Sequence, residues 1–124
     1  MEEFRQAQYA FNRLYPALAI EMDEIVWDKA LFIAIEHDEV HAVRYILKRF
    51  AGATQWTNDI GDKAIHHSIR HGAFSAFCDV IDYSAEIDTR TSAGLTPVQV
   101  ARVTNQKCIG EMLKILAKVN ANFD

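Results

Sequence analysis

GDKAIHHSIRHG, at residues 61–72, is the stretch that shows how this chain is organised. A related segment, GLTPVQVARVTN, begins at Gly94, and another, WDKALFIAIEHD, begins at Trp27, so the copies recur at a nearly constant interval. In each copy a short helical pattern is followed by a break and then by a second helical pattern. Helices of this length are marginal when isolated in water. We therefore expect the copies to stabilise one another by stacking.

The apolar residues predict two helices in each copy. Leu31 and Ile35, like Ile65 and Ile69, lie one helical turn apart and so share one face of the first helix. The second helices show the i, i+3, i+4, i+7 spacing of a helix with one buried face, at Phe74, Phe77, Cys78 and Ile81, at Val40, Val43 and Leu47, and at Met112, Ile115, Leu116 and Val119.

Turn-forming residues separate these helical patterns. Gly72 can take the left-handed conformation that ends a helix, and Thr96 followed by Pro97 is typical of a helix start. Between the copies, QWTNDIG at residues 55–61 and EIDTRTSAG at residues 86–94 combine strand formers with turn residues. These two segments predict hairpin-like fingers.

A repeat of about 33 residues with two helices and a β-turn, marked by T-P-L-H-x-A, resembles the ankyrin family. GLTPVQVA, at residues 94–101, is the best match, with Gln99 at the histidine position. The copy at residues 61–68 keeps Gly61 and His66, whereas the copy that begins at Trp27 is weaker. The resemblance implies an all-α helical solenoid with short β-hairpin-like fingers between the helix pairs.

On this basis we expect a single domain over residues 1–124. Repeats occupy 27–60, 61–93 and 94–124, the last including a C-terminal cap. Residues 1–26 are expected to supply an N-terminal capping half-repeat and its connection, because Phe4, Ala7, Phe11 and Leu14 form one apolar stripe.

Composition excludes several classes of function. The net charge is -4, with acids and bases interspersed, which argues against nucleic acid as a partner. No apolar run reaches the length of a membrane span, and the N-terminus lacks a signal peptide's basic residues, so no membrane partner and a cytoplasmic location are expected. For a pathogen protein, the resemblance adds a host cytosol as the destination. Cys78 and Cys108 are expected to be buried free thiols, with a disulfide as the alternative.

The histidines and carboxylates do not form a catalytic motif. His67 and His71 lie four positions apart on one predicted helical face, but two ligands do not complete a zinc site, so we expect no metal and no cofactor. The resemblance implies that His66 hydrogen-bonds the neighbouring finger. The carboxylates are expected to be solvated, and no phosphate-binding loop or nucleophile elbow is present. We therefore expect no enzyme.

The resemblance implies a non-catalytic protein-protein interaction module that binds another protein through its concave side, as a small inhibitor or regulator. Alternatives are an adaptor, a self-associating homodimeric scaffold, and a metal-binding enzyme built on His66, His67 and His71. Trp56 is the expected anchor, unless its indole packs into the gap between repeats. The expected partner-binding residues are Glu36, His37, Trp56, Asn58, Asp59, Ile60, Asp62, Arg70, His71, Arg90, Ser92, Leu95, Arg102 and Thr104.

Overall fold

The computed structural model describes residues 5, 26–84 and 86–123, and in these residues the regular structure is helical, as predicted. The predicted capping half-repeat at residues 1–26 lies almost entirely outside them. The helices are α2 (Trp27–Glu36), α3 (Val40–Arg49), the 3-10 turn η2 (Ala53–Gln55), α4 (Ala64–Arg70), α5 (Phe74–Tyr83), α6 (Pro97–Val103) and α7 (Ile109–Lys118).

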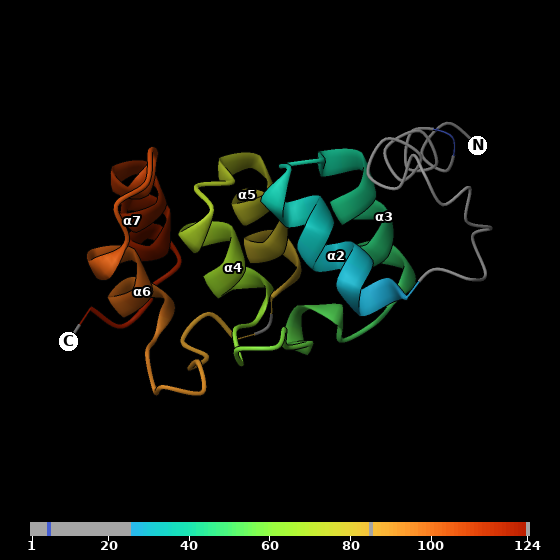
Figure 1. Ribbon diagram of the computed structural model, residues 1–124. Helices are drawn as coiled ribbons and strands as arrows, with labels where there is room; N and C mark the ends of the chain where they lie inside the picture. Colours follow the sequence, from blue (N-terminus) through green and yellow to red (C-terminus); the bar gives the residue numbers. More distant parts are fainter. Residues whose placement is uncertain (1–4, 6–25, 85, 124) are drawn as a thin grey trace.

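The α-helices within residues 26–84 and 86–123 form three pairs that follow one another along the chain (Figure 1). Helix α2 packs on α3, α4 on α5, and α6 on α7. Helix α4 also contacts α2 and α6, and α3 also contacts α5, so neighbouring pairs lie against each other. The prediction of two helices per copy, stacked on their neighbours, is confirmed for these residues.

One continuous apolar core runs through the three pairs. Leu31, Ile35, Ile65 and Ile69 are at most 2% exposed, which confirms the buried face predicted for the first helices. On the second helices, Phe77 and residues such as Val43, Met112 and Leu116 are fully buried. Burial of each large aliphatic or aromatic side chain contributes about 1.5–3 kcal/mol.

The first helices of the first two pairs end in the same way. Asp38 and Gly72, which occupy equivalent positions of successive copies, both adopt left-handed backbone with φ of 52° and 62°. The next amide donates back into the helix in each case, from Glu39 to Ala34 and from Ala73 to Ser68, at 2.9 Å. The left-handed conformation predicted for Gly72 is confirmed, and the break at Asp38 places His37 and His41 on different sides of a helix boundary, as expected.

The two turns between pairs also share their geometry. Asn58 Oδ1 accepts hydrogen bonds from the amides of Ile60 and Asp62, at 3.1 and 2.9 Å. Thr91 Oγ1, at the equivalent position of the next turn, accepts from the two equivalent amides at 3.2 and 3.1 Å. Gly61 and Gly94 take the left-handed position of each turn, with φ of 84° and 85°.

The hairpin-like fingers are not confirmed as strands. In residues 26–84 and 86–123, β pairing amounts to one antiparallel bridge between Thr57 and Lys63. The side chains of Asn58 and Thr91 satisfy turn amides directly. This local bonding replaces the ladder that a longer hairpin would need.

His66 joins the turn before α4 to the next turn along the stack. Its fully buried ring accepts a hydrogen bond from the Lys63 amide through Nδ1, at 3.0 Å, and donates from Nε2 to the Thr89 carbonyl, at 2.9 Å. Gln99 caps α6 in the equivalent way, accepting from the amide of Thr96 at 2.9 Å. The structural role implied for His66 and the helix start at Thr96 are both confirmed.

The prediction that both cysteines are buried is wrong for Cys108. Cys78 and Cys108 are free thiols, but only Cys78 is partly buried, and that burial, aided by nearby carboxylates, raises the pKa of its thiol. Cys108 is exposed, because it lies before α7 with a left-handed backbone, φ 67°, instead of inside the helix.

Alanine substitutions at the two turn glycines should differ in cost. At either position alanine must adopt a positive φ, which costs about 1 kcal/mol. A Cβ on Gly94 meets no atom within 4 Å, whereas a Cβ on Gly61 would lie 2.5 Å from Ser92 Cβ. Gly61→Ala should therefore destabilise the protein by roughly 1–3 kcal/mol more than Gly94→Ala in denaturant unfolding. Equal losses would contradict this turn packing.

Stability should fall with acidification below pH 6.5. Burial lowers the pKa of both His66 and His67 below the ordinary value of 6.5, so the unfolded chain takes up protons that the folded chain does not. The loss begins as pH falls through 6.5, with a slope of at most about 1.4 kcal/mol per pH unit for each histidine. His66→Gln copies the Gln99 cap and should flatten this slope. Chemical unfolding of the wild type and of His66→Gln in EDTA, between pH 7.5 and 5.5, measures this pH dependence. The same slope in both proteins would contradict the assignment to His66.

Candidate functional site

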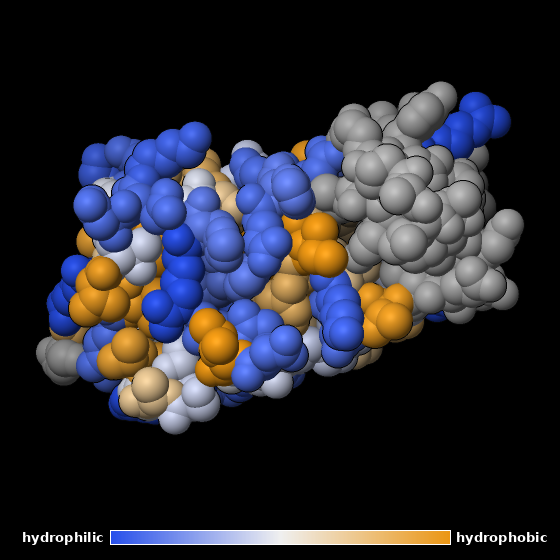
Figure 2. Space-filling view, in the orientation of Figure 1, coloured by the Kyte–Doolittle hydropathy of each residue, from blue (hydrophilic) through white to orange (hydrophobic). Residues whose placement is uncertain are grey.

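A groove of about 450 Å³ lies between α2 and the turn that follows η2. Helix α2 lines it with Asp28, Lys29, Phe32, Ile33 and Glu36, the turn with Thr57, Asn58, Asp59 and Ile60, and α4 with His67. Figure 2 shows separate hydrophobic patches among hydrophilic side chains on the face that Figure 1 presents. Four of the predicted partner-binding residues meet in this groove, namely Glu36, Asn58, Asp59 and Ile60.

Ile60 is the large apolar side chain that the groove leaves most open to solvent. It is 64% exposed, at the tip of a turn whose backbone Asn58 holds in place. The groove residues carry three carboxylates, on Asp28, Glu36 and Asp59, against the single ammonium of Lys29. The groove is therefore complementary to a ligand that has an apolar group flanked by basic groups.

Trp56 does not project from the turn as a free anchor. Its half-buried indole packs on Phe50, with 5.6 Å between ring centroids, and Phe50 in turn packs on Trp27 at 5.2 Å. Trp56 and Trp27 line a second hollow together with Phe50. These contacts place the indole against Phe50 at the end of α3, within residues 27–60, and Trp56 does not line the candidate groove.

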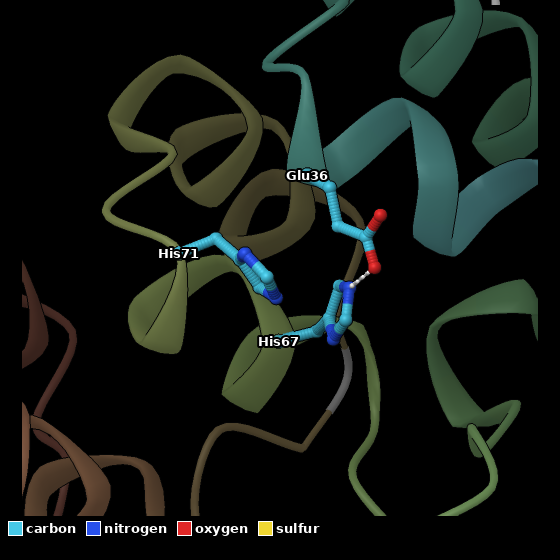
Figure 3. A group of neighbouring side chains, drawn as sticks. All are labelled: Glu36, His67 and His71. Carbon is cyan, nitrogen blue, oxygen red and sulfur yellow. Dashed lines mark hydrogen bonds and ion pairs between the residues drawn. The ribbon is translucent and has the colours of Figure 1, made fainter.

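Glu36, His67 and His71 converge beside the groove (Figure 3). Glu36 comes from the end of α2, His67 from α4 and His71 from the residue after α4, and one ligand atom from each lies within 4.8 Å of the other two. His67 donates from Nε2 to Glu36 Oε1 at 3.1 Å, while its Nδ1 accepts from the Asn58 side-chain amide at 3.2 Å. The histidine spacing was visible in the sequence, but Glu36 carried no signal because it lies on another helix.

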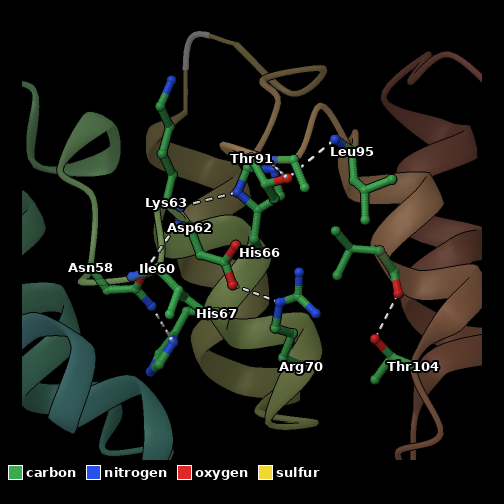
Figure 4. Close-up of polar contacts among 12 residues, drawn as sticks. Asn58, Ile60, Asp62, Lys63, His66, His67, Arg70, Thr91, Leu95 and Thr104 are labelled. Atoms are coloured by element: carbon green, nitrogen blue, oxygen red, sulfur yellow. Dashed lines mark hydrogen bonds and ion pairs between the residues drawn. The ribbon is translucent and has the colours of Figure 1, made fainter.

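Asp62 is not available to a partner. Its side chain is 1% exposed and accepts a hydrogen bond from Arg70 Nε at 2.6 Å (Figure 4). Asp79 is likewise buried and paired, with Arg44 at 3.1 Å. The expectation that the carboxylates are solvated is therefore wrong for Asp62 and Asp79, because arginines from helix surfaces reach them.

The remaining predicted residues lie outside the groove, and most of them bond to nearby backbone. Ser92 Oγ donates to the Ile60 carbonyl at 2.8 Å and so connects the two turns. Arg90 donates to Gly94 at 2.8 Å, Arg102 to Phe123 at 2.7 Å, and Thr104 to Val100 at 2.6 Å. Leu95 is half-buried and His37 is exposed at the end of α2.

No protein-family model matches the chain, and no curated protein matches it. In the residues that the structure describes, no helix combines the length and apolarity that crossing a membrane requires.

Removing Arg70 should destabilise the protein, and removing both members of its ion pair should restore most of the lost stability. Arg70→Val leaves the Asp62 carboxylate buried without its charged partner, which should cost about 2–3 kcal/mol. Leu95 and Val103 occupy the equivalent positions in the next copy. The double variant Asp62→Leu with Arg70→Val copies them and should recover most of the lost free energy of unfolding. A double variant no more stable than Arg70→Val alone would contradict the pairing.

Proposed function

We propose that this chain is a non-catalytic protein-protein interaction module of the ankyrin-repeat type, acting as a small inhibitor or regulator. It binds its partner through the groove between α2 and the turn at residues 57–60. The observation that carries this proposal is the open groove with Ile60 exposed at its edge and carboxylates around it.

The repeated geometry supports the ankyrin-type assignment. The turn acceptors Asn58 and Thr91 recur at the same interval as the turn glycines Gly61 and Gly94. The side chains that cap α4 and α6, His66 and Gln99, also recur at that interval. Repeat units at 27–60, 61–93 and 94–124, with a cap at 1–26, are the corresponding division of the chain.

The groove favours a partner segment that presents an apolar side chain next to lysine or arginine. Phe32 and Ile33 line the same groove as Ile60, and contact with these side chains gives affinity in proportion to the apolar area removed from water. The carboxylates of Asp28, Glu36 and Asp59 speed association with a basic segment and make it sensitive to salt.

Selection of binders from a displayed peptide library tests this proposal. Ile60→Asp should weaken the selected peptides at least tenfold, because a charge replaces the exposed apolar contact. Tyr83→Asp is the matched control, since Tyr83 is an exposed large apolar side chain, 41% exposed, at the end of α5 and outside the groove. Fluorescence anisotropy gives the affinities, and circular dichroism checks that both variants keep the helicity and melting temperature of the wild type.

Peptides that are basic and apolar, and that lose affinity only with Ile60→Asp, are the expected result. Equal weakening by both variants, or binding that is unaffected by Ile60→Asp, would contradict the groove assignment. Light scattering over a concentration series tests the alternative of self-association. In that case the measured mass rises with protein concentration, and Ile60→Asp abolishes the rise.

A further inference from the structure

His67 is a buried imidazole at a position where the two neighbouring helix pairs carry apolar residues. The equivalent residues of the preceding and following copies are Ile33 and Val100. The side chain of His67 is only 8% exposed, and its two nitrogens are satisfied by residues outside α4, Glu36 and Asn58. A buried polar group costs stability unless it is hydrogen-bonded, so an aliphatic residue would be the simpler choice for packing. This departure from the repeat points to a role beyond packing.

We propose that Glu36, His67 and His71 form a binding site for a divalent transition-metal ion of the zinc class. Two imidazoles and one carboxylate are a ligand set that Zn²⁺ uses where a fourth position is left to water. His67 Nε2 and Glu36 Oε1 are 3.1 Å apart, close to the ~3.3 Å expected between two ligands of one tetrahedral ion.

The third ligand needs only a side-chain movement. All three ligand atoms lie within 4.8 Å of one another, and His71 is exposed at the end of α4, where its ring can rotate toward the other two. Burial lowers the pKa of His67, which favours the neutral ring that a metal ligand must have.

Asn58 sets the proton position on the His67 ring. Because Asn58 Oδ1 accepts from the amides of Ile60 and Asp62, its amide nitrogen faces His67 Nδ1 and the ring proton lies on Nε2. An ion on Nε2 requires that proton to move to Nδ1, where it would face the Asn58 amide hydrogens. Asn58 is therefore a positioning residue that lowers the affinity of the site for the metal ion. Aspartate at this position would keep the turn acceptor and accept a hydrogen bond from Nδ1, as outer carboxylates do in zinc sites.

An ion at this site would also change the groove. Glu36 and His67 both line it, so a bound cation would offset the negative charge of Glu36 that faces a partner. The metal site itself does not depend on the proposed protein-binding function, and its test needs no partner.

The test uses the untagged full chain, freed of metal with EDTA, and titrates it with Zn²⁺ by calorimetry and with Co²⁺ by visible absorption. We expect saturable binding of one ion and the absorption bands of tetrahedral Co²⁺. His71→Ala should weaken Zn²⁺ binding by roughly tenfold or more, and Asn58→Asp should tighten it by roughly tenfold. Glu36→Gln keeps a hydrogen-bond acceptor for His67 but removes the charge, so it should weaken binding like His71→Ala. His41→Ala, on the exposed face of α3, is the matched control and should change nothing.

Absence of saturable binding, or equal weakening by His41→Ala and His71→Ala, overturns the site. Tight binding that Asn58→Asp fails to improve overturns coordination through Nε2. Thermal unfolding in EDTA shows whether each variant is folded before the titration. A rise in melting temperature on adding Zn²⁺, present in the wild type and reduced in Glu36→Gln, provides a second measure of binding.

Discussion

The structure depends on packing between neighbouring helix pairs, because its central helix is too short to be stable alone. Helix α4 has seven residues, and isolated helices below about 12–15 residues are marginal in water. Six of the seven, Ala64–Ile69, are buried, and the helix lies against α2, α5 and α6. The pair formed by α4 and α5 is therefore stabilised by packing against both neighbours. The groove follows from that contact, because α2 and α4 line it together.

Side-chain hydrogen bonds to the backbone hold the turn that forms one wall of the groove. Asn58 closes its own turn, Ser92 fixes that turn to the next, and His66 connects Lys63 to Thr89. These bonds replace a β ladder and hold the turn that carries Ile60. For the proposed binding, a wall held by such bonds would lose less conformational entropy on contact than an unbonded loop.

The sequence predicted the features that recur with the repeat and missed those that join different repeats. The apolar spacing at Leu31, Ile35, Ile65 and Ile69 indicates a buried helical face. Gly72 and Thr96 are residue types that favour the backbone conformation of a helix end and a helix start. The helices and their ends could therefore be predicted. The Asp62–Arg70 pair was missed because periodicity does not show that a turn carboxylate folds inward. Glu36 was assigned to the surface correctly, but its approach to His67 depends on how closely two pairs pack.

The polar chain through His67 connects the two sides of the groove. Glu36 accepts from His67 Nε2, His67 Nδ1 accepts from Asn58, and Asn58 Oδ1 accepts from the amide of Ile60. An ion in the proposed metal site would replace the hydrogen bond between His67 Nε2 and Glu36 and would require the ring proton on Nδ1, where it would face the Asn58 amide. On that proposal, charge at the end of α2 is linked through His67 to the turn that presents Ile60. An aliphatic side chain at position 67 would keep the packing and remove this link.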